Sequence, residues 1–386
     1  MNRHFLRDIA DIQTGPFGSQ LHKDDYVDIG TPIVTVEHLG NRVFTEQNLP
    51  KVSDEDKARL SKYVLKEGDI VFSRVGSVDR CSYVDAAHDG WMFSGRCLRV
   101  RPNTEVDPLY LYYFFCLEDT KQFVRNIAVG ATMPSINTKL LGEVEVAYPL
   151  QTEQQKIVAL LSALDDKIEI NQKINDNLQQ QAAALFANFY DQAETEVGFT
   201  EMIQILGGGT PKTGESSYWN GDIPFFTPKD VGFPYTLTTE KTITEEGLAH
   251  CNSRLYPINT VFVTARGTVG KVGLPGVPMA MNQSCYALVG KDTHQLLVYF
   301  YTLKAVDRLK HKASGAVFDA ITTRDFEAEN IMKLSDDDTK AFLDVAEPIY
   351  QAVLNNSIEN LRLSELRDSL LPKLMNGEID VTDIRL

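Results

Sequence analysis

The residues of this chain that are capable of chemistry do not form a catalytic set. None of the seven histidines belongs to an H-E-x-x-H zinc motif, and no Pro-Pro pair exists for the N/D-P-P-Y/F motif of adenine methylation. Residues 207–214 are glycine-rich but lack the Lys-Ser/Thr pair of a phosphate loop. Residues 267–273 carry a glycine at every third position, not as G-x-G-x-x-G. We therefore expect a non-catalytic protein with no bound metal or cofactor.

Polar and basic side chains suited to nucleic acid occur in two sets of loops. Arg74 and Arg266 each follow an apolar run, among Gly, Ser and Thr, and arginine in such a loop can bond a guanine edge twice. Each arginine could equally bind phosphate, or close its loop through a carboxylate. The other residues of these loops that could bond nucleic acid are Ser77, Arg96, Thr132, Ser135, Asn137, Thr210, Lys212, Thr268, Lys271, Asn282, Gln283 and Ser284.

Several of these candidates also have a plain structural explanation. Asn282 and Gln283 suit adenine in the major groove, but such residues form turns as readily. The loop 130–138 either bonds DNA or simply connects two elements. Thr210 and Lys212 lie in a glycine-rich loop and suit backbone phosphate. A basic helix end, either a phosphate contact or a solvated face, consists of Lys304, Arg308, Lys310 and Lys312.

The elements that must position these loops include one very long helix. Residues 152–190 contain no Gly or Pro, and their apolar residues recur at spacings of three, four or multiples of these. Thr152 and Gln155 form a predicted capping box at its start. A helix of this length spans roughly 58 Å at about 1.5 Å per residue. Its centre is too polar for a membrane, so its apolar stripe needs a protein partner.

A second stretch of the same chain provides that partner. A shift of 185 residues superposes Ile157 on Phe342, and it superposes Asn171 on Asn356 and Asn175 on Asn360. An asparagine on or beside an apolar seam fixes the register of two helices at some cost in stability. Chance agreement between two amphipathic helices is the alternative, but the flanking segments agree as well.

The segments that precede the two long stretches also repeat one another. Each contains short strands, a helix and polar loops in the same order, with insertions confined to loops. The matched features are Arg74 with Arg266, Cys97 with Cys285, the predicted helices 109–127 and 296–312, and the loops 130–137 and 315–322. This order predicts that one ancestral unit, a mixed α/β (α+β) domain followed by a long helix, was duplicated.

Composition restricts how such a protein can act. The 386 residues carry a net charge of −15, of which the segments 151–195 and 334–386 contribute −10, so the domains between them are nearly neutral. Tight DNA binding by this chain alone is therefore not expected, and a partner should supply much of the phosphate contact. Five cysteines without a CxxC pair fit a reducing compartment. With no secretory signal and no membrane-length apolar run, we expect a cytoplasmic protein.

Two motifs point to a known family. The stretch PLQTEQQKIVALLSALDDKIEINQKINDNL, residues 149–178, resembles the central helical region of the specificity subunits of Type I restriction-modification enzymes. The stretch LRDSLLPKLMNGEIDV, residues 366–381, resembles the distal region of the same subunits. The resemblance covers essentially the whole chain. The second helix departs from the pattern, since it lacks the P-L-x-x-E-Q signature and contains Pro348, which leaves its straightness open.

The resemblance implies both an architecture and a function. It implies target-recognition domains at residues 1–150 and 196–333, a central long helix at 151–195, and a distal long helix with a C-terminal tail at 334–386. The two helices would pack as an antiparallel coiled coil with an internal pseudo-two-fold axis and act as a spacer. The subunit would read a bipartite site on double-stranded DNA. Two modification subunits would methylate adenine, and restriction subunits would translocate and cleave the DNA.

The same repeat also allows a second interpretation, in which the protein belongs to a different functional class. The chain could be a two-lobed structural or interaction scaffold that never touches DNA, with its duplicated domains binding protein. Protection of two short DNA blocks by the assembled complex would favour the specificity subunit over the scaffold.

Overall fold

The computed structural model divides the chain into two compact units. The first consists of Met1–Asp165 and Glu365–Leu386, and the second of Asp166–Ser364. Each unit contains a mixed α/β domain and segments of both long helices. No helix in the described part of the chain combines the length and apolar character needed to cross a bilayer. The structure describes residues 1–386 except 17, 19, 233, 313–319 and 383–386.

The first unit is built on an antiparallel sheet of four strands in the order β2-β9-β6-β7. All four residues of β6 are buried, as expected for an apolar run in the middle of a sheet. A second sheet has the order β3-β5-β4-β8, in which β4 and β8 are parallel. The bounds are β1 (Asn2–Phe5), β2 (Ala10–Thr14), β3 (Tyr26–Val27), β4 (Thr31–Val34), β5 (Lys51–Val52), β6 (Ile70–Ser73), β7 (Cys81–Tyr83), β8 (Met92–Phe93), β9 (Cys97–Pro102) and β10 (Glu145–Tyr148).

Helices α1, α3 and α5 pack against the four-stranded sheet of the first unit. The prediction of one helix over residues 109–127 is wrong, because the backbone of Leu117 is not helical and separates α3 from α4. Helix α3 begins where the Asp107 carboxylate accepts the N–H groups of Leu109 and Tyr110. The bounds are α1 (Leu6–Ile9), α2 (Asp54–Arg59), α3 (Pro108–Cys116), α4 (Glu118–Ile127) and α5 (Thr138–Leu141).

The second unit contains a sheet of five strands in the order β12-β19-β16-β17-β14 and a smaller sheet β15-β13-β18. Its strand bounds are β11 (Thr195–Gly198), β12 (Ile203–Gly207), β13 (Trp219–Phe226), β14 (Tyr235–Thr236), β15 (Thr242–Ile243), β16 (Val261–Thr264), β17 (Val272–Pro275), β18 (Ala280–Met281), β19 (Cys285–Gly290) and β20 (Asn330–Lys333). Its short helices are α7 (Phe199–Met202), α8 (Glu245–Ala249), α9 (Gln295–Lys312) and α10 (Thr323–Glu327).

The strand orders of the two units confirm the predicted duplication. Strands β2, β9, β6 and β7 of the first unit correspond to β12, β19, β16 and β17 of the second, in the same order and direction. The parallel pair β4 and β8 corresponds to β13 and β18. The pair β1 and β10 likewise corresponds to β11 and β20. Strand β14 extends the larger sheet of the second unit and has no counterpart in the four-stranded sheet of the first unit.

Two long helices run through both units, as predicted: α6 (Gln151–Gln192) with 42 residues and α11 (Asp336–Met375) with 40. Pro348 lies inside α11 without ending it. The predicted capping box at Thr152 is wrong, because the helix begins one residue earlier. In the first turn of α6, the side chain of the buried Gln154 accepts the N–H of Asp107 at 2.7 Å.

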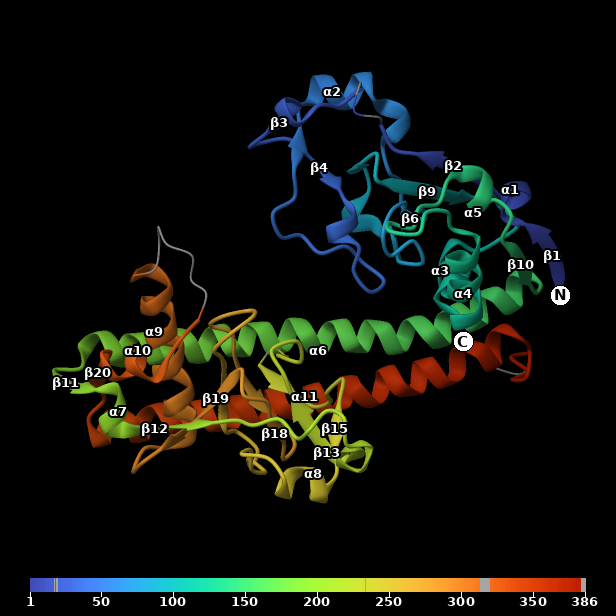
Figure 1. Ribbon diagram of the computed structural model, residues 1–386. Helices are drawn as coiled ribbons and strands as arrows, with labels where there is room; N and C mark the ends of the chain where they lie inside the picture. The colour runs from blue at the N-terminus through green and yellow to red at the C-terminus, as the bar shows by residue number, and fades with distance from the viewer. Residues whose placement is uncertain (17, 19, 233, 313–319, 383–386) are drawn as a thin grey trace. The chain divides into compact units, whose positions relative to one another are not determined.

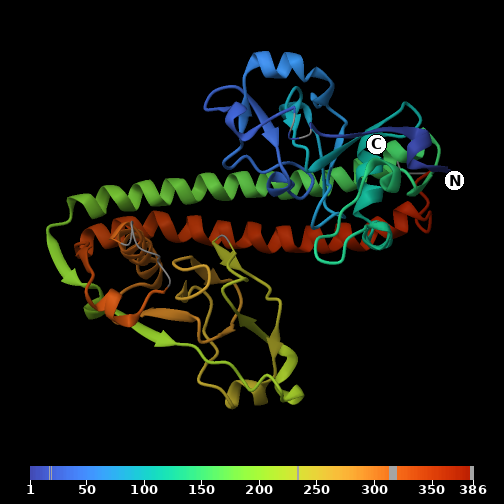
Figure 2. The same cartoon turned by 45° about the horizontal axis from the view of Figure 1, so that its top comes forward.

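Segments of α6 and α11 pack antiparallel in each unit (Figures 1 and 2). In the second unit the Nδ2 of Asn171 donates to the Oδ1 of Asn360, and the Nδ2 of Asn356 donates to the Oδ1 of Asn175, each at 2.8 Å. The 185-residue repeat converts one of these contacts into the other. Because Asn171 and Asn175 are both buried, a shifted register would leave their amides unpaired.

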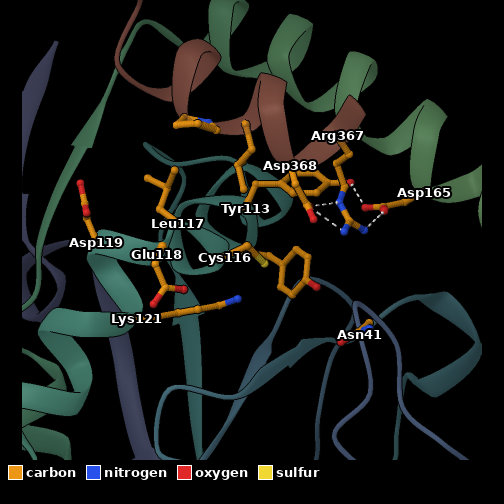
Figure 3. A pocket seen from close by; sticks show the side chains of 13 residues that line it. Asn41, Tyr113, Cys116, Leu117, Glu118, Asp119, Lys121, Asp165, Arg367 and Asp368 are labelled. Carbon is orange, nitrogen blue, oxygen red and sulfur yellow. Dashed lines mark hydrogen bonds and ion pairs between the residues drawn. The ribbon is translucent and has the colours of Figure 1, made fainter. Parts of the chain in front are cut away.

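The first unit holds its helix pair through a polar cluster. The hydroxyl of Tyr113 on α3 donates to Asp165 on α6 at 2.6 Å, and Arg367 on α11 donates to the same carboxylate at 2.7 Å (Figure 3). Burial and the nearby carboxylate both raise the pKa of Tyr113, so its hydroxyl remains a donor. Asp165 is only 8% exposed, which makes its two partners essential.

Candidate nucleic-acid interface

The first unit gathers its predicted contact loops at one edge of its central sheet. Strands β2 and β6 end there, and β9 begins there, because neighbouring strands are antiparallel. A Cβ atom at Gly15 would lie 2.1 Å from the carbonyl oxygen of Ser94, so only glycine allows these loops to touch. We define the first edge as residues 74–77, 94–96 and 129–137.

Arg74 holds the first edge together. Its N–H donates to the carbonyl of Arg96 at 2.8 Å, and its guanidinium donates to the carbonyl of Gly95 at 3.1 Å. Arg74 is thus joined to residues 95 and 96 through their backbone carbonyls. Arg96 differs, since its side chain is exposed and has neither a hydrogen bond nor an ion pair with a described residue. Ser77, also exposed, lies on the same loop as Arg74.

The loop 129–137 lies against Arg74. The N–H of Ile136 donates to the carbonyl of Arg74 at 2.9 Å. Ser135 donates its hydroxyl to Val129 at 3.2 Å, and Asn137 caps α5 by accepting the N–H of Leu140 at 2.9 Å. Thr132 is exposed near the middle of the loop. The structural explanation therefore applies to Ser135 and Asn137, which shape the loop on which Thr132 is exposed.

The second unit repeats this arrangement at the corresponding edge. A Cβ atom at Gly208 would lie 2.1 Å from the carbonyl oxygen of Asn282, matching the contact at Gly15. Thr210 donates its hydroxyl to the side-chain carbonyl of Gln283. Most of the predicted counterpart of the loop 130–137, residues 315–319, lies outside the described residues. We define the second edge as residues 208–213, 265–271 and 282–284.

The polar side chains of the second edge play different parts. Asn282 turns the chain, since its Oδ1 accepts the N–H of Ser284 at 3.0 Å. Gln283 is exposed and keeps its amide nitrogen for a further partner. Lys212 is exposed, and its carbonyl accepts the indole N–H of Trp219 at 3.2 Å. Direct contact with a base is thus open to Gln283 in particular.

Arg266 projects from the second edge without a partner among the described residues. Its side chain is exposed, while its N–H donates to the carbonyl of Ser284 at 3.3 Å. The hydroxyl of Thr268 donates to the carbonyl of Pro228 at 3.2 Å. Lys271 is exposed immediately before the first residue of β17. Two donors suited to DNA, Arg266 and Lys271, therefore flank an ordered loop.

The sequence-based pairing of Arg74 with Arg266 is wrong by one residue. Ile70 pairs with Val100 in the first sheet, and Val261 pairs with Leu288 in the second, which equates Arg74 with Ala265. Successive side chains of a strand point to opposite faces, so this shift separates the two arginines. The alignment of the two repeats matched arginine with arginine by residue type. The hydrogen-bond register of the strands, which decides the equivalent positions, pairs them differently.

Sequence reasoning also missed a matched turn beside each edge. In the first unit, the N–H and hydroxyl of Thr35 lie 3.1 and 2.9 Å from the Nδ1 of His38. In the second, the N–H and hydroxyl of Thr227 donate to Asp230 at 2.8 and 2.6 Å. The turns follow corresponding strands, β4 and β13. A shared T-x-x-H/D pattern was the available signal, hidden by an offset of 192 residues instead of 185.

The basic end of α9 is structural for the most part. Arg308 donates to the hydroxyl of Tyr190, and the Nζ of Lys304 lies 5.2 Å from the centre of the Tyr190 ring. Lys312 forms an ion pair with the buried Glu329. These contacts fasten α9 to the end of α6 and to β20, so a phosphate contact is not needed to explain them.

Nucleophilic cysteine chemistry is absent from the matched cysteines. Burial raises the pKa of Cys97 and of Cys285 to about 12, so both remain protonated thiols at neutral pH. No group of His, Cys, Asp and Glu within the described ranges has the arrangement of a metal site. The polar groups gathered at the two edges are hydrogen-bond donors and acceptors, which suit recognition.

A duplicated mixed α/β domain with matched polar edges, combined with two long helices, defines a protein with two recognition heads. The family of the Type I restriction modification DNA specificity domain matches residues 2–180 and 195–333. The chain belongs to this family. It is a DNA specificity subunit with two target-recognition domains, itself non-catalytic, and this assignment decides against the scaffold alternative.

Curated relatives match nearly the full length. The chain is 25% identical to the Type I restriction enzyme HindI specificity subunit of Haemophilus influenzae, over 84% of this chain and 89% of the relative. It is 22% identical to the MjaIX specificity subunit of Methanocaldococcus jannaschii, over 98% and 93%. The solved Type I S subunit from M. genitalium has a similar fold, with a TM-score of 0.57 at 15% identity, covering 97% of this chain and 95% of that one.

Proposed function

We propose that this subunit reads a bipartite site on double-stranded DNA, one half through residues 1–150 and the other through residues 196–333. The observation that carries the proposal is the pair of matched edges, where the same end of each sheet presents exposed polar side chains: Arg96 and Thr132 in the first unit, and Arg266, Lys271 and Gln283 in the second. Guanidinium and amide groups are the side chains that read guanine and adenine in the major groove. The fourteen residues predicted from the sequence remain the candidates for contact.

The charge of the chain implies that it does not bind DNA alone. With a net charge of −15, it needs partners that neutralise phosphates. We propose two modification subunits, one for each repeat, because a duplicated module offers the same docking surface twice. Restriction subunits would join this assembly and supply translocation and cleavage. We infer a cytoplasmic location, because the proposed substrate is chromosomal DNA.

The long helices would act as the spacer between the two half-sites. At about 1.5 Å per residue, the 42 residues of α6 span roughly 63 Å. Since B-DNA advances about 34 Å per turn, this length suits half-sites separated by a turn or two. The asparagine contacts between α6 and α11 would keep the spacer in a single register.

Methylome sequencing of a host with and without this protein tests the proposal. We expect adenine methylation at one bipartite motif, with two short specified blocks and an unread gap, only when the subunit is present. Footprinting of the assembled complex should protect the same two blocks. Protection that ignores sequence, or a motif with a single block, would contradict the proposal.

The spacer is tested by deletion of seven residues from each long helix. Seven residues preserve the apolar stripe and remove roughly 10 Å, which corresponds to about three base pairs. The unread gap should shorten while both blocks stay the same. A single deletion in α6 serves as the control and should abolish activity through mispairing of the helices. An unchanged gap after both deletions would mean that the helices do not set the spacing.

A further inference from the structure

The matched turns beside the two edges carry opposite charges. Glu37 lies in the first turn and Lys229 occupies the equivalent position in the second, because Ile33 pairs with Met92 as Phe225 pairs with Ala280. In each turn the flanking threonine and its partner three residues later make the local hydrogen bonds. The side chains of Glu37 and Lys229 take no part in these hydrogen bonds.

Both turns adjoin the edges already described. Glu37 lines a hollow of about 920 Å³ that is shared with Ser94, Gly95 and Arg96 of the first edge. The turn of Lys229 is tied to the second edge, since the preceding Pro228 accepts the hydroxyl of Thr268 at 3.2 Å. Glu37 and Lys229 therefore belong to turns that adjoin the edges at which we propose that DNA is read.

Neither charge has a close partner among the described residues. Glu37 is exposed and has no hydrogen bond or ion pair with a described residue, although Arg96 lines the same hollow. The side chain of Lys229 is 82% exposed and reaches Glu240 only at 3.9 Å. A surface pair of this kind contributes little, so Lys229 is available to a ligand.

The chemistry of the DNA grooves restricts what these charges can bind. Phosphates repel a carboxylate, so in the major groove Glu37 can interact favourably only with the exocyclic amino groups of cytosine or adenine. An ammonium group that reaches a base edge is best accepted by the O6 and N7 of guanine. Opposite charges at equivalent positions would therefore give the two heads different preferences.

We propose that Glu37 and Lys229 read bases at equivalent positions of the two half-sites. Glu37 selects cytosine or adenine through the amino group in the major groove, and Lys229 selects guanine. This inference rests on the proposed bipartite reading of DNA. It adds to that proposal the position in each domain at which the two specificities diverge.

The test uses the full subunit assembled with its modification subunits and a library of randomised DNA sites. Methylation of the library is sequenced for the wild type, for Glu37→Gln and for Lys229→Gln. We expect Glu37→Gln to lower discrimination at one base pair of one half-site by about tenfold or more. Lys229→Gln should do the same at one base pair of the other half-site.

Matched controls remove the same charges elsewhere. Glu67→Gln acts at the opposite end of β6, and Lys333→Gln acts on β20; both residues are exposed. Neither control should change the motif. Melting temperatures of all four variants should equal that of the wild type, because no side chain removed is buried.

The outcomes separate the inference from the proposed function. A wild-type complex without a bipartite motif would overturn the proposed function itself. A bipartite motif that survives both substitutions unchanged would leave that function standing and overturn this inference. The inference also fails if Lys229→Gln weakens all sequences equally and reduces the salt dependence of binding, since that is the behaviour of a phosphate contact.

Discussion

The two units attach their domains to the long helices with different chemistry at matched positions. The first unit uses Tyr113, Asp165 and Arg367, joined by hydrogen bonds of 2.6 and 2.7 Å. In the second, Phe300 takes the place of Tyr113 and Tyr350 takes the place of Asp165, with ring centres 5.6 Å apart. A single backbone frame thus accepts either a satisfied polar cluster or an aromatic one.

The edges of the sheets differ in the same manner. Arg74 is drawn back onto Gly95, whereas Arg266 projects outward, and Glu37 stands where the second unit has Lys229. The repeated strands keep the loops in equivalent places, and the side chains on those loops are free to diverge. If the edges read DNA as proposed, the duplication fixes where each head reads and leaves open which bases it prefers.

The largest expected effect follows from disrupting the aromatic cluster that joins α9 to the long helices in the second unit. Phe186 is 2% exposed and packs against Phe300 at 5.0 Å and Phe342 at 5.5 Å. Phe186→Ala should destabilise this unit by about 3–5 kcal/mol through the cavity that it leaves. Urea unfolding monitored by hydrogen exchange of the α9 amide protons measures the lost stability. Phe123→Ala, at a site 41% exposed, is the control and should cost under about 0.5 kcal/mol.

The polar anchor of the first unit should respond almost as strongly. Arg367→Ala leaves the carboxylate of Asp165 buried without its cation, at a cost of about 3 kcal/mol. Exchange of α3 amide protons should report the loss. The triple substitution Tyr113→Phe, Asp165→Leu and Arg367→Leu imitates the apolar anchor and should recover most of the stability. Failure to recover would show that the two anchors are not interchangeable.

At the edges, Arg266→Ala tests the outward-facing arginine. Loss of a base contact should weaken recognition of one half-site by roughly 1–3 kcal/mol and leave the other unaffected. Methylation rates on sites with single substitutions in each half provide the measurement. Equal weakening of both halves would assign Arg266 a positioning role.

The smallest expected effect concerns Arg74, whose guanidinium bonds the carbonyl of Gly95. Arg74→Ala removes that hydrogen bond and should lower stability by about 1 kcal/mol. Exchange of the amide protons of residues 94–97 should rise, while the base preference of the half-site stays the same. A changed base preference with unchanged exchange would make Arg74 a reader like Arg266.

Periodicity and repetition over long stretches of the sequence predicted most of the fold. Helical spacing over residues 152–190 predicted α6, and the 185-residue shift predicted both α11 and the duplicated domains. The details at the boundaries did not follow. Leu117 breaks one predicted helix in two, and Thr152 lies inside α6 instead of capping it. Such boundaries depend on a few local hydrogen bonds, which a periodic pattern does not encode.

The sequence by itself determined the repeat, the length of the helices and the set of polar loops, because periodicity and composition follow from the chain alone. Only the tertiary structure decided that Arg74 corresponds to Ala265, and that Glu37 and Lys229 occupy the same position. Hydrogen-bond ladders between strands distant in sequence set those equivalences. A shift of one residue reverses the face of every side chain, so strand register determines which groups can meet a ligand.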